Sequence, residues 1–161
     1  MRETRTPTPS PTIHASAVLV GAHAVLIRGP AGSGKSRLAL ALVDAANGGG
    51  VPFARLVADD RTHVDAVHGR LVARAPAELA GLIEVRGLGI RRLPSEQAAV
   101  VDLVVDLAAN DAERLPDPAQ CETEIAGIRV PRLPVAPMAD ALAAVLAARR
   151  TAPATNQQVC G

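Results

Sequence analysis

Residues 29–36 read GPAGSGKS, and this short run constrains the fold more than any other part of the chain. Its glycines, lysine and serine have the spacing G-x-x-x-x-G-K-[ST] of a phosphate-binding loop. The apolar run AVLI precedes it at 24–27, and apolar residues at helical spacing follow it after Lys35. Because such a loop joins a strand to a helix, the segment predicts an α/β domain.

The loop also predicts a ligand. Backbone N–H groups close around phosphate oxygens in such loops, which requires glycine where a side chain would obstruct them, and the helix start adds unpaired donors. Lys35 is expected to reach the β and γ phosphates, and the Ser36 hydroxyl to ligate Mg²⁺. The expected nucleotide-binding residues are Gly29, Pro30, Ala31, Gly32, Ser33, Gly34, Lys35 and Ser36. The motif does not identify the base.

Other periodic segments complete the predicted domain. We expect strands at 13–20, 24–27, 53–60 and 100–108, a helix after Lys35 that Asn47 and the Gly48–Gly50 run would stop, a hairpin over 62–76 turning at His68-Gly69, and a helix at 138–150. This order predicts a single α/β catalytic domain with a mixed, covered β-sheet over residues 13–150. The Thr/Pro-rich residues 1–12 and the polar residues 151–161 are expected to form a flexible arm and tail.

Composition and charge exclude several classes of function. The formal net charge is +1 and neither sign forms a long block, so no general nucleic-acid or membrane surface is expected. Phe53 is the single aromatic residue, which excludes base stacking on aromatic rings. No apolar stretch approaches the roughly 20 residues of a membrane span. Cys121 and Cys160 predict neither a metal site nor a disulfide, and we expect a cytoplasmic protein.

Asp59 and Asp60 end the segment RLVADD, with Asp60 25 positions after Lys35 (60 − 35). A Mg-nucleotide site needs a carboxylate at the end of a neighbouring strand. One acid is expected to hold Mg²⁺ directly or through water, and the other to take a proton from an incoming hydroxyl. Asp102 and Asp106, in VVDLVVDLA, are competing candidates for the carboxylate beside the metal. The remaining histidines, His23, His63 and His68, are expected at the surface or in turns.

Residues 84–90 read EVRGLGI, a charged and glycine-rich segment that packing alone does not require. Gly87 and Gly89 permit backbone conformations closed to other residues. Together with IHASAVLV, GPAGSGKS and LVADD, in this order and at these distances, the pattern E-x-R-G-L-G-I resembles the HPr kinase/phosphorylase family of bacteria. The resemblance covers residues 13 to about 135.

The resemblance implies an ATP-dependent serine kinase that acts on an HPr-like phosphocarrier protein and also removes the phosphate by phosphorolysis. It makes Lys35 a catalytic phosphate ligand, and Ser36 and Glu84 the ligands of Mg²⁺. Asp60 would accept the proton of the serine. His14 and Arg114 would stand at the positions of a functional histidine and a functional arginine. The resemblance also implies a homo-oligomer, a hexamer.

Some residues depart from the family's pattern. Ala15 stands after the histidine where the family has glycine, Arg37 replaces an acid, and Arg91 and Arg92 replace apolar residues. The Gly-Arg-Asn part of a loop after IRVPRLPVAP is absent, which weakens the expectation of phosphorolysis more than that of the kinase reaction. The chain resembles the short form of alpha-proteobacteria, without a separate amino-terminal domain. Two alternatives remain: a small-molecule P-loop kinase or NTPase, and a nucleotide-dependent binding module without phosphate transfer.

Overall fold

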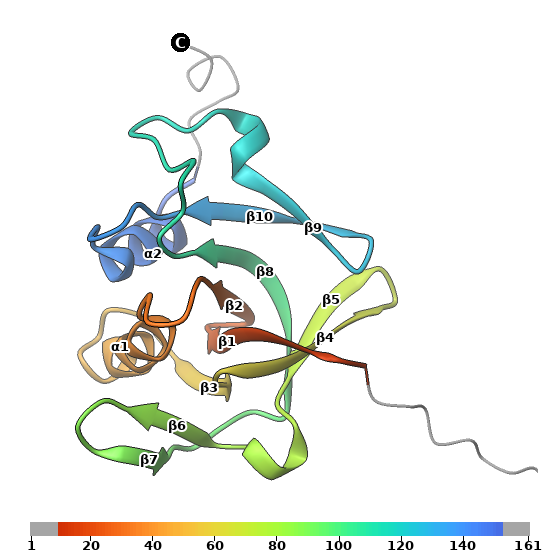
Figure 1. The fold of residues 1–161 in the computed structure, drawn as a ribbon, viewed down its shortest axis with the longest axis vertical. Helices are drawn as coiled ribbons and strands as arrows, with labels where there is room; N and C mark the ends of the chain where they lie inside the picture. Colours follow the sequence, from red (N-terminus) through yellow and green to blue (C-terminus); the bar gives the residue numbers. More distant parts are fainter. Residues whose placement is uncertain (1–9, 153–161) are drawn as a thin grey trace, which may run out of the picture.

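Ten strands and two α-helices make up residues 10–152, the part of the chain that the computed structural model describes (Figure 1). The strands are β1 Thr12–Val20, β2 His23–Arg28, β3 Ala54–Ala58, β4 Arg61–Val67, β5 Arg70–Arg74, β6 Leu82–Val85, β7 Gly89–Arg92, β8 Ala98–Asp106, β9 Glu122–Ile125 and β10 Ile128–Pro134. The helices are α1 Lys35–Asn47 and α2 Ala141–Arg150, and two short 3₁₀ helices span Ala77–Leu79 and Pro118–Cys121.

The sheet is mixed, as predicted. β1 pairs antiparallel with β2, β3 and β4, whereas β8 runs parallel to both β2 and β10. Because β2 pairs with β8, the strands β2, β1, β4, β5 and β8 close into a ring, and β10 and β9 extend the sheet beyond it. β6 and β7 form a separate hairpin, which is the structure of the EVRGLGI segment.

Two apolar clusters fill the two sides of the sheet. One lies under α1 and α2 and includes Val18, Ile27, Leu42 and Val145. The other lies inside the ring of strands, where small residues such as Ala15, Ala17 and Ala73 permit tight curvature. Both helices therefore cover the same face, and the ring covers the other (Figure 1).

Both predicted helices are present. α1 occupies the predicted segment, with Gly34 directly before its first residue, Lys35, and Gly48 directly after its last, Asn47. α2 begins at Ala141, three residues later than predicted, where Asp140 caps the helix by accepting a hydrogen bond from the backbone N–H of Ala143. The hairpin that turns at His68-Gly69 is also present, as β4 and β5.

Two expectations need correction. The strand that leads to the acid pair is not the neighbour of β2, because β1 lies between β2 and β3. That strand does end at the two acids, as predicted: β3 ends at Ala58, and after Asp59 and Asp60 the chain continues as β4 along the same partner strand, β1. His63 is buried and its ring Nδ1 bonds to the carbonyl oxygen of Ser10, so it is not a surface residue.

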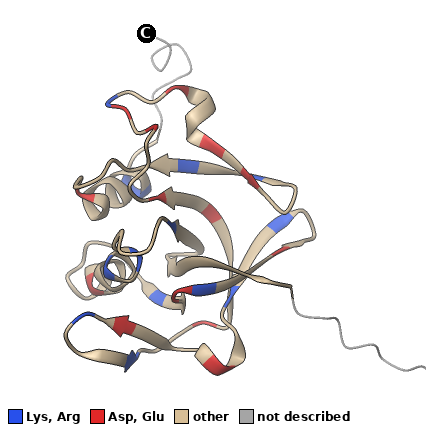
Figure 2. Ribbon diagram, viewed as in Figure 1, with Lys and Arg blue, Asp and Glu red and all other residues tan. Residues whose placement is uncertain are grey.

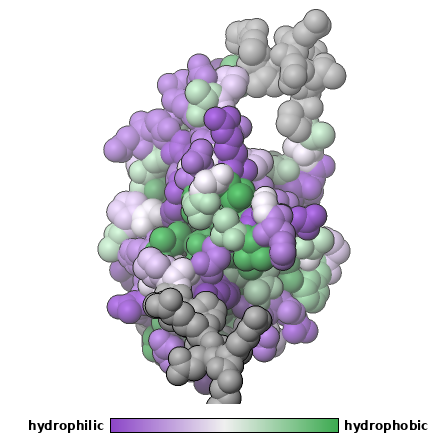
Figure 3. All heavy atoms as spheres, turned by 90° about the vertical axis from the view of Figure 1, so that its right-hand side faces the viewer, coloured by the Kyte–Doolittle hydropathy of each residue, from purple (hydrophilic) through white to green (hydrophobic). Residues whose placement is uncertain are grey.

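The surface agrees with the expected absence of one dominant charge. Figure 2 shows basic and acidic residues interspersed over the fold. Figure 3 shows apolar side chains gathered in the middle of the face beside the β4–β5 and β9–β10 hairpins, bordered by hydrophilic ones. Between residues 10 and 152, no helix is long and apolar enough to cross a membrane. The predicted arm and tail lie largely outside these residues, and β1 begins at Thr12, inside the predicted arm.

Candidate functional site

The predicted phosphate-binding loop, residues 29–36 and called the phosphate loop below, joins the end of β2 to the start of α1. Gly29 is required by close packing, because a Cβ atom there would lie 2.5 Å from Ser33 Oγ and 3.1 Å from Leu107. Gly34 has a φ of 98°, which L side chains rarely adopt, and its carbonyl accepts the first helical hydrogen bond, from Leu38. The glycines at both ends of the loop are therefore structural requirements of its tight course.

Lys35 lies beneath this loop. Its side chain is buried, and Nζ donates to the carbonyl oxygens of Gly29 at 2.8 Å and Pro30 at 3.2 Å. No side chain caps the start of α1, so its first-turn N–H groups stay available for an anion. A buried cation and free backbone donors at one bend form a cradle suited to phosphate oxygens.

Asp59 is the acid that faces the phosphate loop. The hydroxyls of Ser36 and Ser16 both donate to its Oδ1 at 2.7 Å, and the backbone N–H of Glu84 donates to its Oδ2 at 3.2 Å. Its residue is only 7% exposed, so the orientation of the carboxylate is fixed by these three donors. Ser16 lies in the strand predicted at 13–20, but no motif of the sequence marks it as part of the site.

This arrangement fits a magnesium ion. Mg²⁺ prefers oxygen ligands and is usually bound by one or two carboxylates together with substrate phosphates and water. Ser36 and Asp59 supply a hydroxyl and a carboxylate in direct contact. The Glu84 side chain is exposed, but its backbone lies against Asp59. Within residues 10–152, no three His, Cys, Asp or Glu side chains form a metal-binding group on their own.

Asp60 faces a different partner. Its Oδ1 lies 2.6 Å from Nε2 of His14, and the two side chains are 62% and 52% exposed. Its φ of 64° is left-handed, which breaks the regular path from β3 to β4 and turns this carboxylate away from the partners of Asp59. The two neighbouring acids thus serve two environments, one buried at the phosphate loop and one open to solvent.

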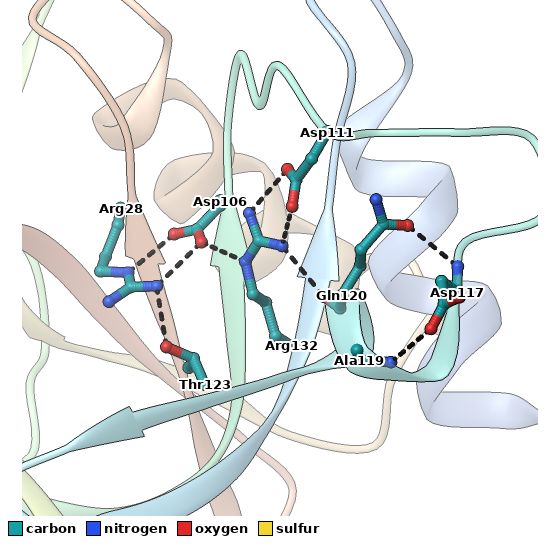
Figure 4. A network of polar contacts seen from close by, with 8 residues as sticks. All are labelled: Arg28, Asp106, Asp111, Asp117, Ala119, Gln120, Thr123 and Arg132. Atoms are coloured by element: carbon teal, nitrogen blue, oxygen red, sulfur yellow. Dashed lines mark hydrogen bonds and ion pairs between the residues drawn. The ribbon is translucent and has the colours of Figure 1, made fainter.

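The competing carboxylates are held in ion pairs. Arg28, the residue before the phosphate loop, donates to both oxygens of Asp106, at 2.7 and 2.8 Å, and Arg132 donates to Oδ2 (Figure 4). Arg132 also makes a two-pronged contact with Asp111 at 2.7 and 2.9 Å. Asp102 lies on β8 four residues before Asp106, and it pairs with Arg149 of α2 and with His23.

Arg28 and Arg132 change the pKa of the carboxylates that they contact. Burial alone would raise the pKa of Asp106, but the hydrogen bonds from Arg28 and Arg132 outweigh it and hold that pKa below its usual value. The hydrogen bond from Arg132 lowers the pKa of Asp111. Asp106 is therefore a carboxylate fully engaged by two guanidinium groups, and its contacts stabilise the ends of β2, β8 and β10 beside the phosphate loop.

Arg114 is the sequence-predicted site residue that the structure does not bring to this group. It is exposed in the segment between β8 and the 3₁₀ helix Pro118–Cys121. No hydrogen bond or ion pair of the described residues joins it to Lys35, Asp60 or His14. The site assembled by the fold consists of the phosphate loop, Ser16, Asp59, Asp60, His14 and the backbone of Glu84.

Known proteins are similar to this chain in sequence and in fold. Residues 6–157 match the family described as the HPr Serine kinase C-terminal domain. The HPr kinase/phosphorylase of Geobacillus thermodenitrificans is 35% identical over 138 residues, covering 79% of this chain and 42% of the relative. That of Clostridium tetani is 38% identical over 87 residues, covering 54% and 26%.

The solved structure titled as the Hpr(Ser) kinase/phosphatase from Coxiella burnetii matches with a TM-score of 0.70 at 27% identity. The match covers 88% of this chain and 95% of that one. Against the curated relatives, in contrast, this chain spans less than half of the full length.

Proposed function

This chain belongs to the family of HPr serine kinase C-terminal domains, and from that premise we propose that it transfers the γ-phosphoryl group of ATP to a serine of an HPr-like protein. The resemblance carried by the segment EVRGLGI is thereby confirmed as a family relationship. The observation that carries the proposal is the pair of acids at one break in the sheet, with Asp59 on Ser36 of the phosphate loop and Asp60 on His14.

The residues of the site divide into those that would bind ATP, the phosphoryl donor, and those that would act on the acceptor serine. The phosphate loop would hold the triphosphate, with Lys35 neutralising charge on the β and γ phosphates. Ser36 and Asp59 would hold Mg²⁺, with Glu84 in reach of the same position through its backbone contact. The metal supplies charge neutralisation of the phosphates when bound.

Asp60 would act as the base. Its carboxylate takes the proton of the serine hydroxyl, the serine oxygen forms a bond to the γ-phosphorus, and the bond to the bridging β–γ oxygen breaks to release ADP. His14, 2.6 Å from Asp60, would orient this carboxylate. A positioned base contributes typically about 10²- to 10⁴-fold to such a rate. In phosphorolysis, an oxygen of inorganic phosphate would bond to the phosphorus of the phosphoserine and the bond to the serine oxygen would break, with Asp60 returning the proton to that oxygen and pyrophosphate leaving.

Arg114 keeps its proposed role as a functional arginine of the family, although it lies outside the assembled site. ATP, Mg²⁺ and an HPr-like protein are the proposed cofactors and partner, and a homo-oligomer is proposed from the family.

Incubation with γ-labelled ATP, Mg²⁺ and purified HPr proteins tests the proposal. Label on a serine of HPr supports it, provided that Lys35→Ala abolishes the label. Hydrolysis of ATP without label on any HPr would favour a small-molecule kinase or NTPase. ATP binding with neither hydrolysis nor transfer would favour a nucleotide-dependent binding module.

A further inference from the structure

A surface hollow of about 340 Å³ lies beside the Asp60–His14 pair. It is lined by Thr12, Ile13, His14, Asp60 and Arg61. These residues come from the first part of β1 and the start of β4, which pair antiparallel. The hollow is therefore built on regular strands, next to the carboxylate that we propose as the base.

The hollow lies on the same face of β1 as the phosphate loop. Side chains two residues apart on a strand point to the same face, so His14 lies on the face of Ser16, which contacts Asp59. Two residues of strand span about 7 Å. Ser36 of α1 reaches this strand through Asp59, which also contacts Ser16. A group held at Ser36 and a group held in the hollow beside His14 would therefore lie close to each other, with Asp59 and Asp60 between them.

Arg61 is the basic residue that lines this hollow together with His14 and Asp60. It is directly opposite His14 in the β1–β4 ladder, and paired residues of an antiparallel ladder present their side chains on one face. Arg61 is exposed, and among residues 10–152 it forms no ion pair, whereas Arg28, Arg132 and Arg149 are all paired with carboxylates. Its charge is thus available to a ligand.

A cation at this point would suit the chemistry of the proposed reaction. A phosphoryl group carried by the acceptor oxygen beside Asp60 is negatively charged, and an opposite charge close to it would stabilise it. Lys35 is assigned to the phosphates of ATP and is buried beneath the phosphate loop, so it is not among the residues that line this hollow. Arginine suits the task because its planar fork binds phosphate oxygens in pairs.

We infer that Arg61 binds the phosphoryl group on the acceptor serine, which makes the hollow beside Asp60 the site for the phosphorylated form of the acceptor protein. The inference rests on the proposed function for the identity of the acceptor, an HPr protein. It assigns Arg61 to recognition of the phosphate, a role separate from the binding of ATP.

Binding measurements with the whole chain test this role. The probes are an HPr protein without phosphate and the same HPr phosphorylated on serine by a full-length relative, so that no activity of this chain is needed to prepare them. Arg61→Gln removes the charge and Arg61→Lys keeps it without the fork. Arg70→Gln is the matched control, because Arg70 is also an exposed arginine at the start of a strand, β5.

Arg61→Gln should weaken binding of the phosphorylated HPr at least tenfold and change binding of the unphosphorylated HPr and of ATP less than twofold. Arg61→Lys should keep part of the preference, and Arg70→Gln should match the wild type. Equal loss of both HPr forms, or unchanged binding of the phosphorylated form, would overturn the inference, as would a wild type that binds no phosphorylated HPr. A wild type that binds it with the predicted preference but transfers no phosphate would overturn the proposed function alone.

Discussion

Replacement of Asp60 separates its chemical role from its structural one. The residue has a φ of 64°, a conformation that asparagine adopts readily and alanine does not. Its carboxylate touches only the ring of His14 among the described residues, and both side chains are more than half exposed. Asp60→Asn therefore changes the charge of the site while it preserves the backbone and the shape of the side chain.

The magnitudes differ between activity and stability. An exposed pair such as His14–Asp60 contributes about 0.2–1 kcal/mol, so Asp60→Asn should lower the free energy of unfolding by no more than that. Asp60→Ala adds a left-handed alanine, which costs roughly 1–2 kcal/mol and lowers Tm by about 2–8 °C in a domain of this size. Both substitutions should lower the rate of phosphate transfer by about 10²- to 10⁴-fold, because both remove the proposed base.

The assay pairs single-turnover transfer from labelled ATP to HPr with thermal unfolding and ATP titration on the same samples. Asp44→Asn, a change at an exposed acid of α1, serves as the control for loss of one negative charge. Asp60→Asn with a Tm near that of the wild type, intact ATP affinity and transfer within threefold of the wild type would refute the assignment of the base.

Other residues of the site give further predictions. Lys35→Ala should weaken ATP affinity at least tenfold in calorimetric titration, because it removes the buried cation beneath the loop, and undiminished affinity would contradict the cradle described here. Asp59→Asn should raise the Mg²⁺ concentration for half-maximal transfer at least tenfold, since the neutral amide binds a cation weakly; an unchanged Mg²⁺ profile would argue against Asp59 as a ligand. Arg132→Gln should lower the free energy of unfolding by roughly 2–4 kcal/mol in urea titration, because it leaves Asp106 and Asp111 with fewer charged donors. The folded pKa of Asp106 lies below its unfolded value, so the stability it supplies is complete above about pH 4 and is lost as the pH falls through the folded pKa; Arg132→Gln should flatten this acid limb of Tm against pH, and an equally steep limb would contradict the network.

Local signals predicted the elements that support the site. The phosphate loop has glycines at both ends, and the run after Asn47 offers nothing that could continue a helix, so the bounds of α1 followed from the sequence. The turn at His68-Gly69 was likewise marked by its own residues. Such signals depend on residues close together in the sequence. They do not depend on which strands pair with each other in the folded sheet.

Pairing between distant segments was not predictable in this way. Arg28 meets Asp106 across 78 positions, and Arg132 meets the same carboxylate across 26. No spacing rule links these residues, because their contact depends on two parallel pairings made by β8. The insertion of β1 between β2 and β3 has the same origin, since the apolar pattern of a strand identifies its buried face but not its neighbours.

The division of labour between Asp59 and Asp60 shows how one local distortion can organise a site. In an undistorted strand two successive side chains point to opposite faces, and one acid would be directed into the apolar interior of the ring. The left-handed Asp60 interrupts the strand instead, so Asp59 reaches the hydroxyl of Ser36 while Asp60 reaches His14 two residues along β1 from Ser16. The strain of a non-glycine residue at positive φ costs of order 1–3 kcal/mol, and it persists where surrounding contacts fix it. Here those contacts are the pairings of β1 with both β3 and β4, which hold the two sides of the break in place. A substitution that relaxed this break would therefore separate Asp59, the proposed metal ligand, from Asp60, the proposed base, without removing either side chain.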